Sequence, residues 1–369
     1  MTEDARWGES SPWSVGVEEE LMLVAPDTLR LETGSEGIVQ AAEELELPGR
    51  IKTELFACVV ELNSGVCETA AEAASVIGHL RSTASELAAE RGLRLMATGT
   101  HPISRAEDQP IVDEPRYRDF VAYAGVSARR QGVNGLHVHV GMPSAEACFQ
   151  ATEAVLPWLP VVLALSVNSP YLAGAATGLA SNRAEILAQL PRSGAPPALR
   201  SYAEWEQLVE RLVSLGLMPD YTMLWWDVRP HPRFGTLEIR MPDQPTRLER
   251  SGAFTALLQA LAVTALRWEP PAYDPPGRFV YQQNRWAALA RGAAAELVHP
   301  RGDRLVGARE LAAELVELVA PAARELSTEH VIAPLASAPT EGDEQLEVGR
   351  ADGLEAVCAR LVERTLRSS

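Results

Sequence analysis

The sequence predicts an α+β fold in which helices pack on the outer face of a largely antiparallel sheet. Short apolar runs rich in β-branched residues indicate strands at residues 14–24, 57–63, 94–100, 135–141 and 235–241. Longer segments with apolar residues at helical spacing lie between these runs. Strands and helices alternate without the regular βαβ cadence of a doubly wound parallel sheet, which favours the α+β class.

Two of the expected helices have recognisable ends. Residues 69–92 stop at Gly92, a residue type common at helix C-caps. Residues 144–167 start at Ser144, a typical N-cap, and Pro157 and Pro160 should split this helix because proline lacks the N–H of the helical ladder. Further helices are expected at about residues 202–215, 248–267, 282–291, 308–326 and 353–366. Surface loops are expected at residues 191–197 and 270–277, and a mobile segment at residues 337–344.

The length allows one large domain or two ordinary ones, and the 46% of hydrophobic residues can fill a large core; we expect a single catalytic domain over residues 1–369. The net charge of −17 argues against a surface for nucleic acid or anionic membrane, because such surfaces need clustered Lys and Arg. We find no apolar run of membrane-spanning length and no leader, so we expect a cytoplasmic protein. The four cysteines form no C-x-x-C pair, which predicts reduced, buried thiols.

The first strand contains three consecutive glutamates, in the sequence GVEEEL. Side chains alternate between the two faces of a strand, so Glu18 and Glu20 point to one face and Glu19 to the other. We therefore expect Glu19 to face solvent or to support the pair from behind. On this interpretation Glu19→Ala is tolerated where Glu18→Ala and Glu20→Ala are not.

Three other strands also place polar side chains two residues apart. The pairs are His137 and His139 in NGLHVHVGM, Glu238 and Arg240 in GTLEIRMPD, and Glu61 and Asn63 in ELFACVVELNSG. One such strand is ordinary in a half-solvated antiparallel sheet. If all four polar faces meet on one sheet, they line an acidic cavity, to which Glu54 also belongs.

An acidic cavity of this kind suits divalent cations, because clustered carboxylates repel one another and ionise only with cations nearby. Mg²⁺ prefers oxygen ligands and often shares its coordination with substrate phosphates, and an arginine adds a planar cation for phosphate. The chain has no G-x-x-x-x-G-K-[ST] motif and no G-x-G-x-x-G after a strand. A nucleotide would therefore be held by metal on the surface of the sheet.

Five motifs, in order along the chain, connect this pattern to a known family. They are GVEEEL (16–21), GTHP (99–102), NGLHVHVGMP (134–143), SNR (181–183) and WWDVRPHPRFGTLEIRMPD (225–243). In this combination the sequence resembles the glutamate–cysteine ligase type 2, or YbdK-like, carboxylate–amine ligases. The resemblance runs from about residue 14 to about residue 360.

The resemblance implies a glutamine-synthetase-like catalytic fold, in which a curved, mostly antiparallel sheet holds ATP and Mg²⁺. The implied reaction forms γ-glutamylcysteine from L-glutamate and L-cysteine through a γ-glutamyl phosphate. The metal ligands implied by the motifs are Glu18, Glu20, Glu61, His137 and Glu238. Arg240 and Arg183 are implied at the transferring phosphoryl group, and Asn134 is implied beside them in nucleotide binding.

Several residue roles stay open at the level of sequence. His139 is a second ligand or a structural residue, Glu54 a ligand or an ion-pair partner, and His101 a loop anchor or a ligand contact. Trp225 and Trp226 stack on an adenine or fill the core. Arg229 and His231 are expected to hold a loop over the site, which Pro230 and Pro232 would stiffen.

Other functions compete with this ligase. His137 and His139 with one glutamate imitate the two-His, one-carboxylate site of a mononuclear metal oxygenase or hydrolase. The same ligase chemistry on another acid and amine is a second alternative, and a non-catalytic relative is a third. We expect small-molecule substrates as partners and a homodimer as the assembly, and loops near residues 105–115 and 193–197 are long enough to move over the site.

Overall fold

The computed structural model describes residues 5–270 and 272–366, so part of the N-terminal segment lies outside the described residues. Its main sheet has the strand order β10 (Val228–His231), β11 (Thr236–Ile239), β5 (Leu136–Gly141), β1 (Val15–Val24), β3 (Val59–Asn63) and β2 (Arg50–Thr53). A further strand, β4 (Arg94–Met96), pairs with the end of β1. Every pairing in this sheet is antiparallel. The expected α+β class with an antiparallel sheet is confirmed.

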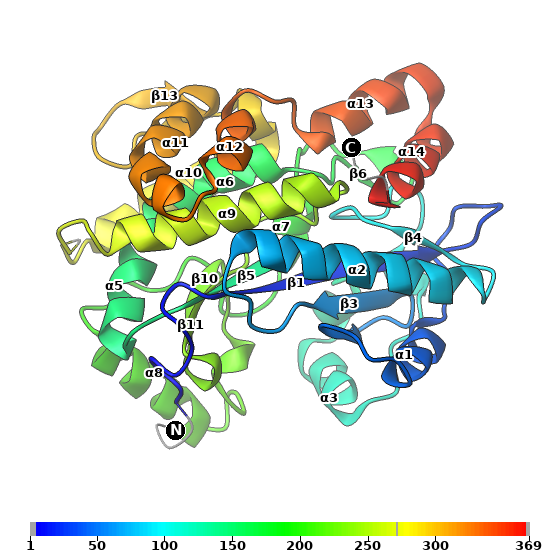
Figure 1. Ribbon diagram of the computed structural model, residues 1–369, viewed down its shortest axis with the longest axis horizontal. Helices are drawn as coiled ribbons and strands as arrows, with labels where there is room; N and C mark the ends of the chain where they lie inside the picture. Colours follow the sequence, from blue (N-terminus) through cyan, green and yellow to red (C-terminus); the bar gives the residue numbers. More distant parts are fainter. Residues whose placement is uncertain (1–4, 271, 367–369) are drawn as a thin grey trace.

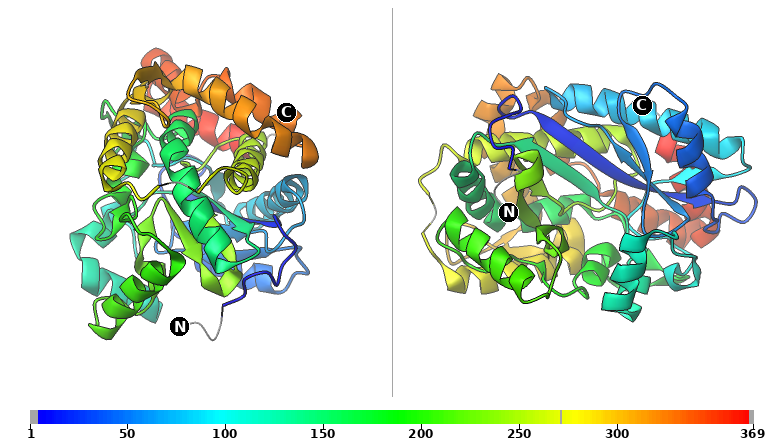
Figure 2. Two further views of the ribbon diagram at one scale, coloured as in Figure 1. Left: turned by 90° about the vertical axis from the view of Figure 1, so that its left-hand side faces the viewer. Right: turned by 90° about the horizontal axis from the view of Figure 1, so that it is seen from below.

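Helices cover one face of the sheet, as expected. The helices α2 (Ala70–Ala89) and α9 (Leu248–Ala265) lie across β1 and β5, and α11 (Ala308–Glu325) packs on α9 (Figure 1). On the other side of the sheet, α3 (Pro115–Ala124) and α8 (Tyr202–Ser214) lie below the strands (Figures 1 and 2). The space between the sheet and these two helices is where the functional residues gather.

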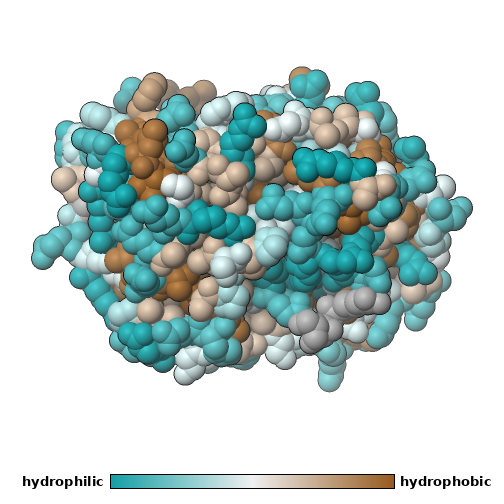
Figure 3. Space-filling model, turned by 90° about the horizontal axis from the view of Figure 1, so that it is seen from above, coloured by the Kyte–Doolittle hydropathy of each residue, from teal (hydrophilic) through white to brown (hydrophobic). Residues whose placement is uncertain are grey.

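The remaining elements surround this arrangement. The helices are α1 (Ser35–Glu43), α4 (Val126–Arg129), α7 (Asn182–Leu187), α10 (Pro275–Arg291), α12 (Glu329–Ile332), α13 (Glu341–Asp352) and α14 (Leu354–Leu366). Short 3₁₀ turns are η2 (Ala106–Asp108), η4 (Tyr221–Met223), η5 (Pro232–Phe234), η6 (Gly292–Ala294) and η7 (Ala333–Ala336). Two-residue or three-residue strands form the pairs β6 (Tyr171–Leu172) with β7 (Ala175–Ala176), β8 (Ser193–Gly194) with β9 (Trp225–Trp226), and β12 (Glu296–Val298) with β13 (Leu305–Gly307). Seen from above, the surface is mainly hydrophilic, with separate hydrophobic patches (Figure 3).

The alternation of side chains along β1 explains which face of the sheet packs against the helices. Val17, Leu21 and Leu23 point toward the covering helices and are at most 2% exposed. Residues of this one face join α2, α9 and α11 in a single hydrophobic core. Burial of apolar area at about 25 cal/mol per Å² therefore fixes which face of β1 is left for the polar side chains.

The prolines of the apolar segment after β5 act as expected. Ser144 caps α5 (Ala145–Val155) by accepting a hydrogen bond from the Ala147 N–H, and the turn η3 (Leu156–Trp158) separates α5 from α6 (Leu159–Ser166). The segment Ala145–Ser166 is apolar and long enough to cross a membrane, but 83% of its most apolar window is buried inside the protein. The segment is therefore apolar because it forms part of the hydrophobic core.

Four expectations for individual elements are wrong. Residues 228–231 form the edge strand β10 rather than a loop, and an edge strand tolerates Pro230 because its missing N–H faces no partner strand. The strand expected over residues 94–100 ends at Met96. Helix α10 already begins at Pro275, since proline suits the first helical position and Asp274 caps the Gly277 N–H.

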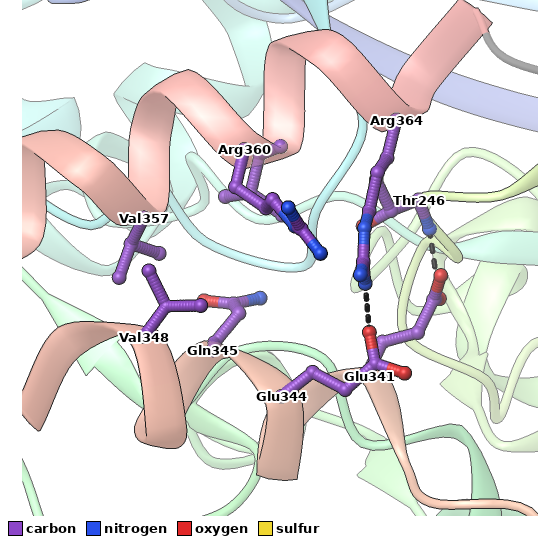
Figure 4. Close-up of a pocket in the computed structure, with 9 residues that line it drawn as sticks. Thr246, Glu341, Glu344, Gln345, Val348, Val357, Arg360 and Arg364 are labelled. Carbon is purple, nitrogen blue, oxygen red and sulfur yellow. Dashed lines mark hydrogen bonds and ion pairs between the residues drawn. The ribbon is translucent and has the colours of Figure 1, made fainter. Parts of the chain in front are cut away.

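The fourth error concerns residues 337–344, which were expected to be mobile. Thr340 and Asp343 form a capping box at the start of α13, and the buried Glu341 carboxylate accepts hydrogen bonds from the Thr246 and Arg247 N–H groups at 2.9 and 3.0 Å. Helices α13 and α14 thus dock as a hairpin, with Glu344 paired to Arg364 (Figure 4). This hairpin packs Val357 and Leu361 over Met22 and Val24, the continuation of the face that carries Glu18 and Glu20.

Candidate active site

The strand register places the predicted polar residues side by side on one face of the sheet. Directly opposed pairs are Glu20 with Glu61, Glu18 with Asn63, Glu18 with His137, His139 with Glu238, and Glu238 with Arg229. Side chains opposed in this way have Cβ atoms about 5 Å apart. The four polar strand faces predicted from the sequence therefore form one continuous surface across five strands.

At the centre of this surface, Glu18 is held ionised by its neighbours. Asn63 Nδ2 donates to Glu18 Oε1 at 3.0 Å, and His137 Nδ1 lies 3.4 Å from Oε2. Burial opposes ionisation of Glu18, but the hydrogen bonds and charges of His137 and His139 outweigh it and lower its pKa. Burial and the positive charge of Arg240 lower the pKa of His137 to about 4, so that ring is neutral at pH 7.

Glu238 is paired with two arginines. Arg229 donates to both carboxylate oxygens, at 2.5 and 3.2 Å, and Arg240 Nη1 donates to Oε1 at 2.6 Å. Burial disfavours the charge of Glu238, but the two guanidinium groups lower its pKa well below the usual value. Arg229 also donates to the Thr222 and Leu224 carbonyls, so it fixes the segment that precedes β9. This contact matches the expectation that Arg229 holds a loop, whereas its pairing with Glu238 was not indicated by the sequence.

A second group of carboxylates lies at the β1–β3 side. Burial and repulsion from Glu54 raise the pKa of Glu20 to about 8, and burial and repulsion from Glu18 raise the pKa of Glu61 to about 7. Burial likewise raises the pKa of Glu54. Lys52, the only lysine of the chain, lies 3.3 Å from the Glu61 carboxylate and forms an ion pair with it.

Arg183 and Arg240 supply positive charge beside these carboxylates. Arg183 donates to the Met241 and Arg240 carbonyls at 3.2 and 3.0 Å, and it packs on Gly135, where a Cβ would overlap its guanidinium group. Both Nε atoms are buried and have no hydrogen-bond partner. Unpaired buried donors are unusual in native proteins, and they mark the two arginines as candidates for binding an anion.

The Asn134 side chain bonds to the backbone of β1. Its side chain donates to the Glu20 carbonyl at 3.0 Å, and it is absent from the described lining of the neighbouring cavities. The Glu20 N–H donates to Gln244 Oε1 at 3.0 Å, and the Gly135 N–H donates to the Glu20 carboxylate at 2.7 Å. Asn134 and Gln244 thus hold the backbone that carries Glu20.

Of the two expectations for Glu19, exposure to solvent is wrong, and Glu19 is more than a spacer between Glu18 and Glu20. It is 0% exposed and forms a bidentate pair with Arg81 of α2, at 2.6 and 2.9 Å. Arg81 also donates to the carbonyls of Thr246, Thr365 and Pro245. The pair therefore joins the active-site strand to α2, to the segment before α9 and to the C-terminal helix.

The residues left open by the sequence are also placed. His101 accepts from the Ile103 and Ser104 N–H groups and contacts the Leu29 carbonyl at 2.9 Å, so it anchors a loop. Trp226 is buried in a cluster with Trp205, whereas Trp225 lines a cavity. His139 Nδ1 lies 2.9 Å from Thr236 Oγ1, and its Nε2 is buried without a partner, 3.9 Å from Glu18.

Two cavities border this polar surface. The large cavity, of about 890 Å³, is lined by Glu20, Glu54, His137, Arg183 and Arg240 on the sheet side. The small cavity, of about 350 Å³, is lined by Glu18, Asn63, His139, Arg233 and Phe234. Glu238 lies between them, because its ion-pair partner Arg240 faces the large cavity and its cross-strand neighbour His139 faces the small one.

The donor set fits Mg²⁺, although within residues 5–270 and 272–366 no group of three His, Cys, Asp or Glu side chains is arranged to hold a metal ion. The carboxylate oxygens of Glu18, Glu20 and Glu61 lie on one face, and oxygen donors are those that Mg²⁺ prefers. Burial and mutual repulsion disfavour the ionised forms of Glu20 and Glu61, a penalty that a divalent cation relieves. These residues are the ones that would hold it.

Comparisons with known proteins identify the family of this chain. A family model described as Glutamate-cysteine ligase family 2 matches residues 14–349. A Rubrobacter xylanophilus protein named “Putative glutamate–cysteine ligase 2-3” is 41% identical over 98% of this chain and 99% of its own length. A similarly named protein of Herpetosiphon aurantiacus is 35% identical over 84% of this chain and 80% of its own.

Solved structures show the same fold at low sequence identity. The crystal structure of a Francisella tularensis glutamate–cysteine ligase in complex with AMP has a TM-score of 0.70 and 14% identity, over 98% of this chain and 90% of that one. A bifunctional glutathione synthetase from Pasteurella multocida has a TM-score of 0.69 and 13% identity, over 96% of this chain and 52% of that one. The expected glutamine-synthetase-like fold is confirmed. The chain belongs to the glutamate–cysteine ligase family 2, and it is an enzyme of the carboxylate–amine ligase type, which forms an amide bond.

Proposed function

We propose that this enzyme uses ATP and Mg²⁺ to phosphorylate the γ-carboxylate of glutamate and then transfers the γ-glutamyl group to an amine. The observation that carries the proposal is the acidic surface, flanked by Arg183 and Arg240, that borders two cavities. Phosphoryl transfer needs two reactants in line and cations on the transferring group. Two cavities that border the same carboxylates and arginines support such an arrangement.

The nucleotide is assigned to the small cavity. Arg6 and Arg233 line it and provide positive charge for phosphates, and the ring of Phe234 is 50% exposed and available for a base. That ring stacks on His231, with centroids 4.2 Å apart, which fixes its orientation. The AMP bound by the Francisella enzyme supports nucleotide use in this fold.

The acid is assigned to the sheet side of the large cavity. Arg183 and Arg240 have unpaired buried Nε–H donors and would hold the γ-carboxylate and then the acyl phosphate. Bound Mg²⁺, held by Glu18, Glu20, Glu61, His137 and Glu238, would neutralise phosphate charge. The amine nitrogen then attacks the γ-carbonyl carbon, the bond from that carbon to the phosphate oxygen breaks, and the amine proton leaves with phosphate.

The test is ADP release by the full chain with ATP, Mg²⁺, glutamate and a panel of amines that includes L-cysteine. We expect ADP and a γ-glutamyl amide in equal amounts. Glu20→Gln should reduce turnover on the order of 10²-fold or more while the unfolding temperature is kept, because Gln preserves the hydrogen bond from Gly135 and removes a charge that burial disfavours.

Glu296→Gln is the matched control, since Glu296 is an exposed strand residue far along the chain from the site, and its turnover should equal that of the wild type. The absence of ADP with every acid and amine would contradict the ligase proposal. Stoichiometric iron in the purified protein without nucleotide binding would favour the mononuclear metal oxygenase instead.

A further inference from the structure

The outer part of the large cavity is mainly apolar. Beyond the sheet side, its walls come from α3, residues 187–190 and the segment 216–225, and Asp119 and Asp220 are the acidic residues among them. The apolar side chains that face it include Phe120, Leu187, Leu190, Leu217, Met218 and Trp225. We call this part the apolar chamber.

Packed aromatic side chains form one wall of the apolar chamber. The rings of Phe120 and Trp225 lie 5.4 Å apart and are tilted by 43°. Behind them, the Arg192 guanidinium packs on the ring of Trp225 at 5.8 Å and on that of Tyr123 at 5.6 Å, and Arg192 Nε donates to the Met223 carbonyl at 3.3 Å. These contacts hold the aromatic side chains in place around the space.

The mouth of the apolar chamber exposes apolar surface to solvent. Leu217 and Tyr123 are each 48% exposed, although both line the cavity. Exposed apolar walls around a cavity with a few convergent charges are typical of a site for a ligand with an apolar portion. Arg116, a cation in the lining of the cavity, is already paired with Glu114 and the Tyr117 hydroxyl.

We propose that the amine substrate carries a bulky apolar, preferably aromatic, group, and that this group fills the apolar chamber. The inference rests on the proposed ligase function. The charged sheet side matches an amino acid such as glutamate, which has three charges, so the mainly apolar outer part of the cavity is left for the second substrate. The small thiol side chain of cysteine would contact little of this wall.

The size of the effect follows from the area buried. An aromatic ring that loses roughly 100 Å² of apolar surface gains stabilisation equivalent to about 10- to 100-fold in kcat/KM at about 25 cal/mol per Å². We therefore compare 2-phenylethylamine, ethylamine and L-cysteine as acceptors with glutamate, ATP and Mg²⁺. The expected result is a kcat/KM for 2-phenylethylamine at least about tenfold above those of the two small amines.

The variant Leu217→Asn makes the wall polar at an exposed position, so the fold should be kept. We expect it to lower kcat/KM for 2-phenylethylamine about tenfold and to leave the KM for ATP and the rate with ethylamine unchanged. Leu215→Asn is the matched control, because Leu215 is 63% exposed and absent from the cavity lining. It should change none of these values.

Three results would overturn parts of the proposal separately. A preference for L-cysteine over 2-phenylethylamine would overturn the apolar chamber as the acceptor site and leave the ligase function standing. An equal rise in the KM for ATP with every amine in Leu217→Asn would assign the wall to the nucleotide. Calorimetric binding of 2-phenylethylamine that Leu217→Asn weakens, without ADP formation, would support the apolar chamber and overturn the ligase chemistry.

Discussion

The bidentate pair of Glu19 and Arg81 is the residue-scale feature on which the active-site strand depends. A buried guanidinium group that loses its carboxylate costs about 3–5 kcal/mol, because the charge stays in a low-dielectric interior without compensation. We predict that Glu19→Ala lowers the free energy of unfolding by about this amount, measured by urea denaturation. A variant with wild-type stability would contradict the burial of this pair.

Glu20→Gln is the control for this prediction at the neighbouring position. Its carboxylate faces the cavity, and its ionisation is disfavoured in the folded protein. We expect its urea midpoint to match or exceed that of the wild type. The two adjacent glutamates would then differ in their effects: substitution of Glu19 lowers the free energy of unfolding, and substitution of Glu20 lowers turnover.

His101 makes stability depend on pH. Its Nδ1 accepts hydrogen bonds from the Ile103 and Ser104 N–H groups, so a proton on Nδ1 would face two donors. Burial lowers its pKa from 6.5 to about 4. Between these values the unfolded chain binds a proton that the folded chain does not, so the free energy of unfolding falls as the pH drops from 6.5 to 4.

The measurement is the free energy of unfolding of wild type and His101→Asn across this pH range. Asn keeps an acceptor for the two N–H groups but does not titrate, so its slope should be shallower by up to about 1.4 kcal/mol per pH unit. His137 and His231 also have pKa values lowered by burial, to about 4 and about 3, so some slope should persist in the variant. Identical slopes would exclude the contribution of His101.

At the scale of elements, the strands that carry polar pairs could be predicted from the alternation of side chains. Glu18, His137 and Glu238 were expected on one face, and the register places them there. Alternation could not show how far Glu19 is buried, because its partner Arg81 is 62 residues away in the sequence. Nor could it reveal β10, since Pro230 disfavours a central strand and the sequence does not say which strand lies at the edge.

The start of β5 gives a prediction at this scale. Gly135 lies against Arg183, and an alanine there would push the guanidinium group from its position between the Arg240 and Met241 carbonyls. We expect Gly135→Ala to reduce turnover on the order of 10²-fold, because a shift of about 1 Å in a positioning group has this effect. The measurement is steady-state ADP release.

Gly302→Ala is the matched control for Gly135→Ala. Gly302 lies in the turn between β12 and β13, and an added Cβ would meet no atom within 4 Å. Its turnover and unfolding temperature should equal those of the wild type. Equal losses in both variants would point to a general effect of alanine in place of glycine.

At the scale of the whole molecule, the C-terminal hairpin α13–α14 completes the face of the sheet that carries the site. Glu341 bonds the backbone of residues 246–247, and Gln244, three residues from Arg247, accepts from the Glu20 N–H. We predict that Glu341→Ala leaves two buried N–H donors unpaired and lowers the free energy of unfolding by about 2–4 kcal/mol. Thermal unfolding with and without urea measures this change.

The exposed Glu310→Ala on α11 is the comparison for this effect, because its side chain lies outside the hairpin. We expect its unfolding temperature to stay within the error of the wild type. A hairpin that could lose the Glu341 contacts without cost would be peripheral to the fold, contrary to its place over Met22 and Val24.

The single domain and the homodimer stay predictions at this scale. Gel filtration with light scattering tests the dimer.

The family and its fold could be predicted from five short motifs, and two of these motifs meet in space through Ser181 and Asp243, whose side chains are 2.8 Å apart. The walls of the large cavity could not be predicted, because they join α3, α7 and segment 216–225, which share no motif.

The pairing of Lys52 with Glu61 also makes the molecule easy to observe. Growth on ¹⁵N-lysine gives an ammonium spectrum with one side-chain resonance, because the chain has one lysine. That nitrogen lies 3.3 Å from a carboxylate of the proposed Mg²⁺ site. Titration with Mg²⁺ should therefore shift a single, already assigned signal, and the enzyme reports the loading of its own centre without an engineered label.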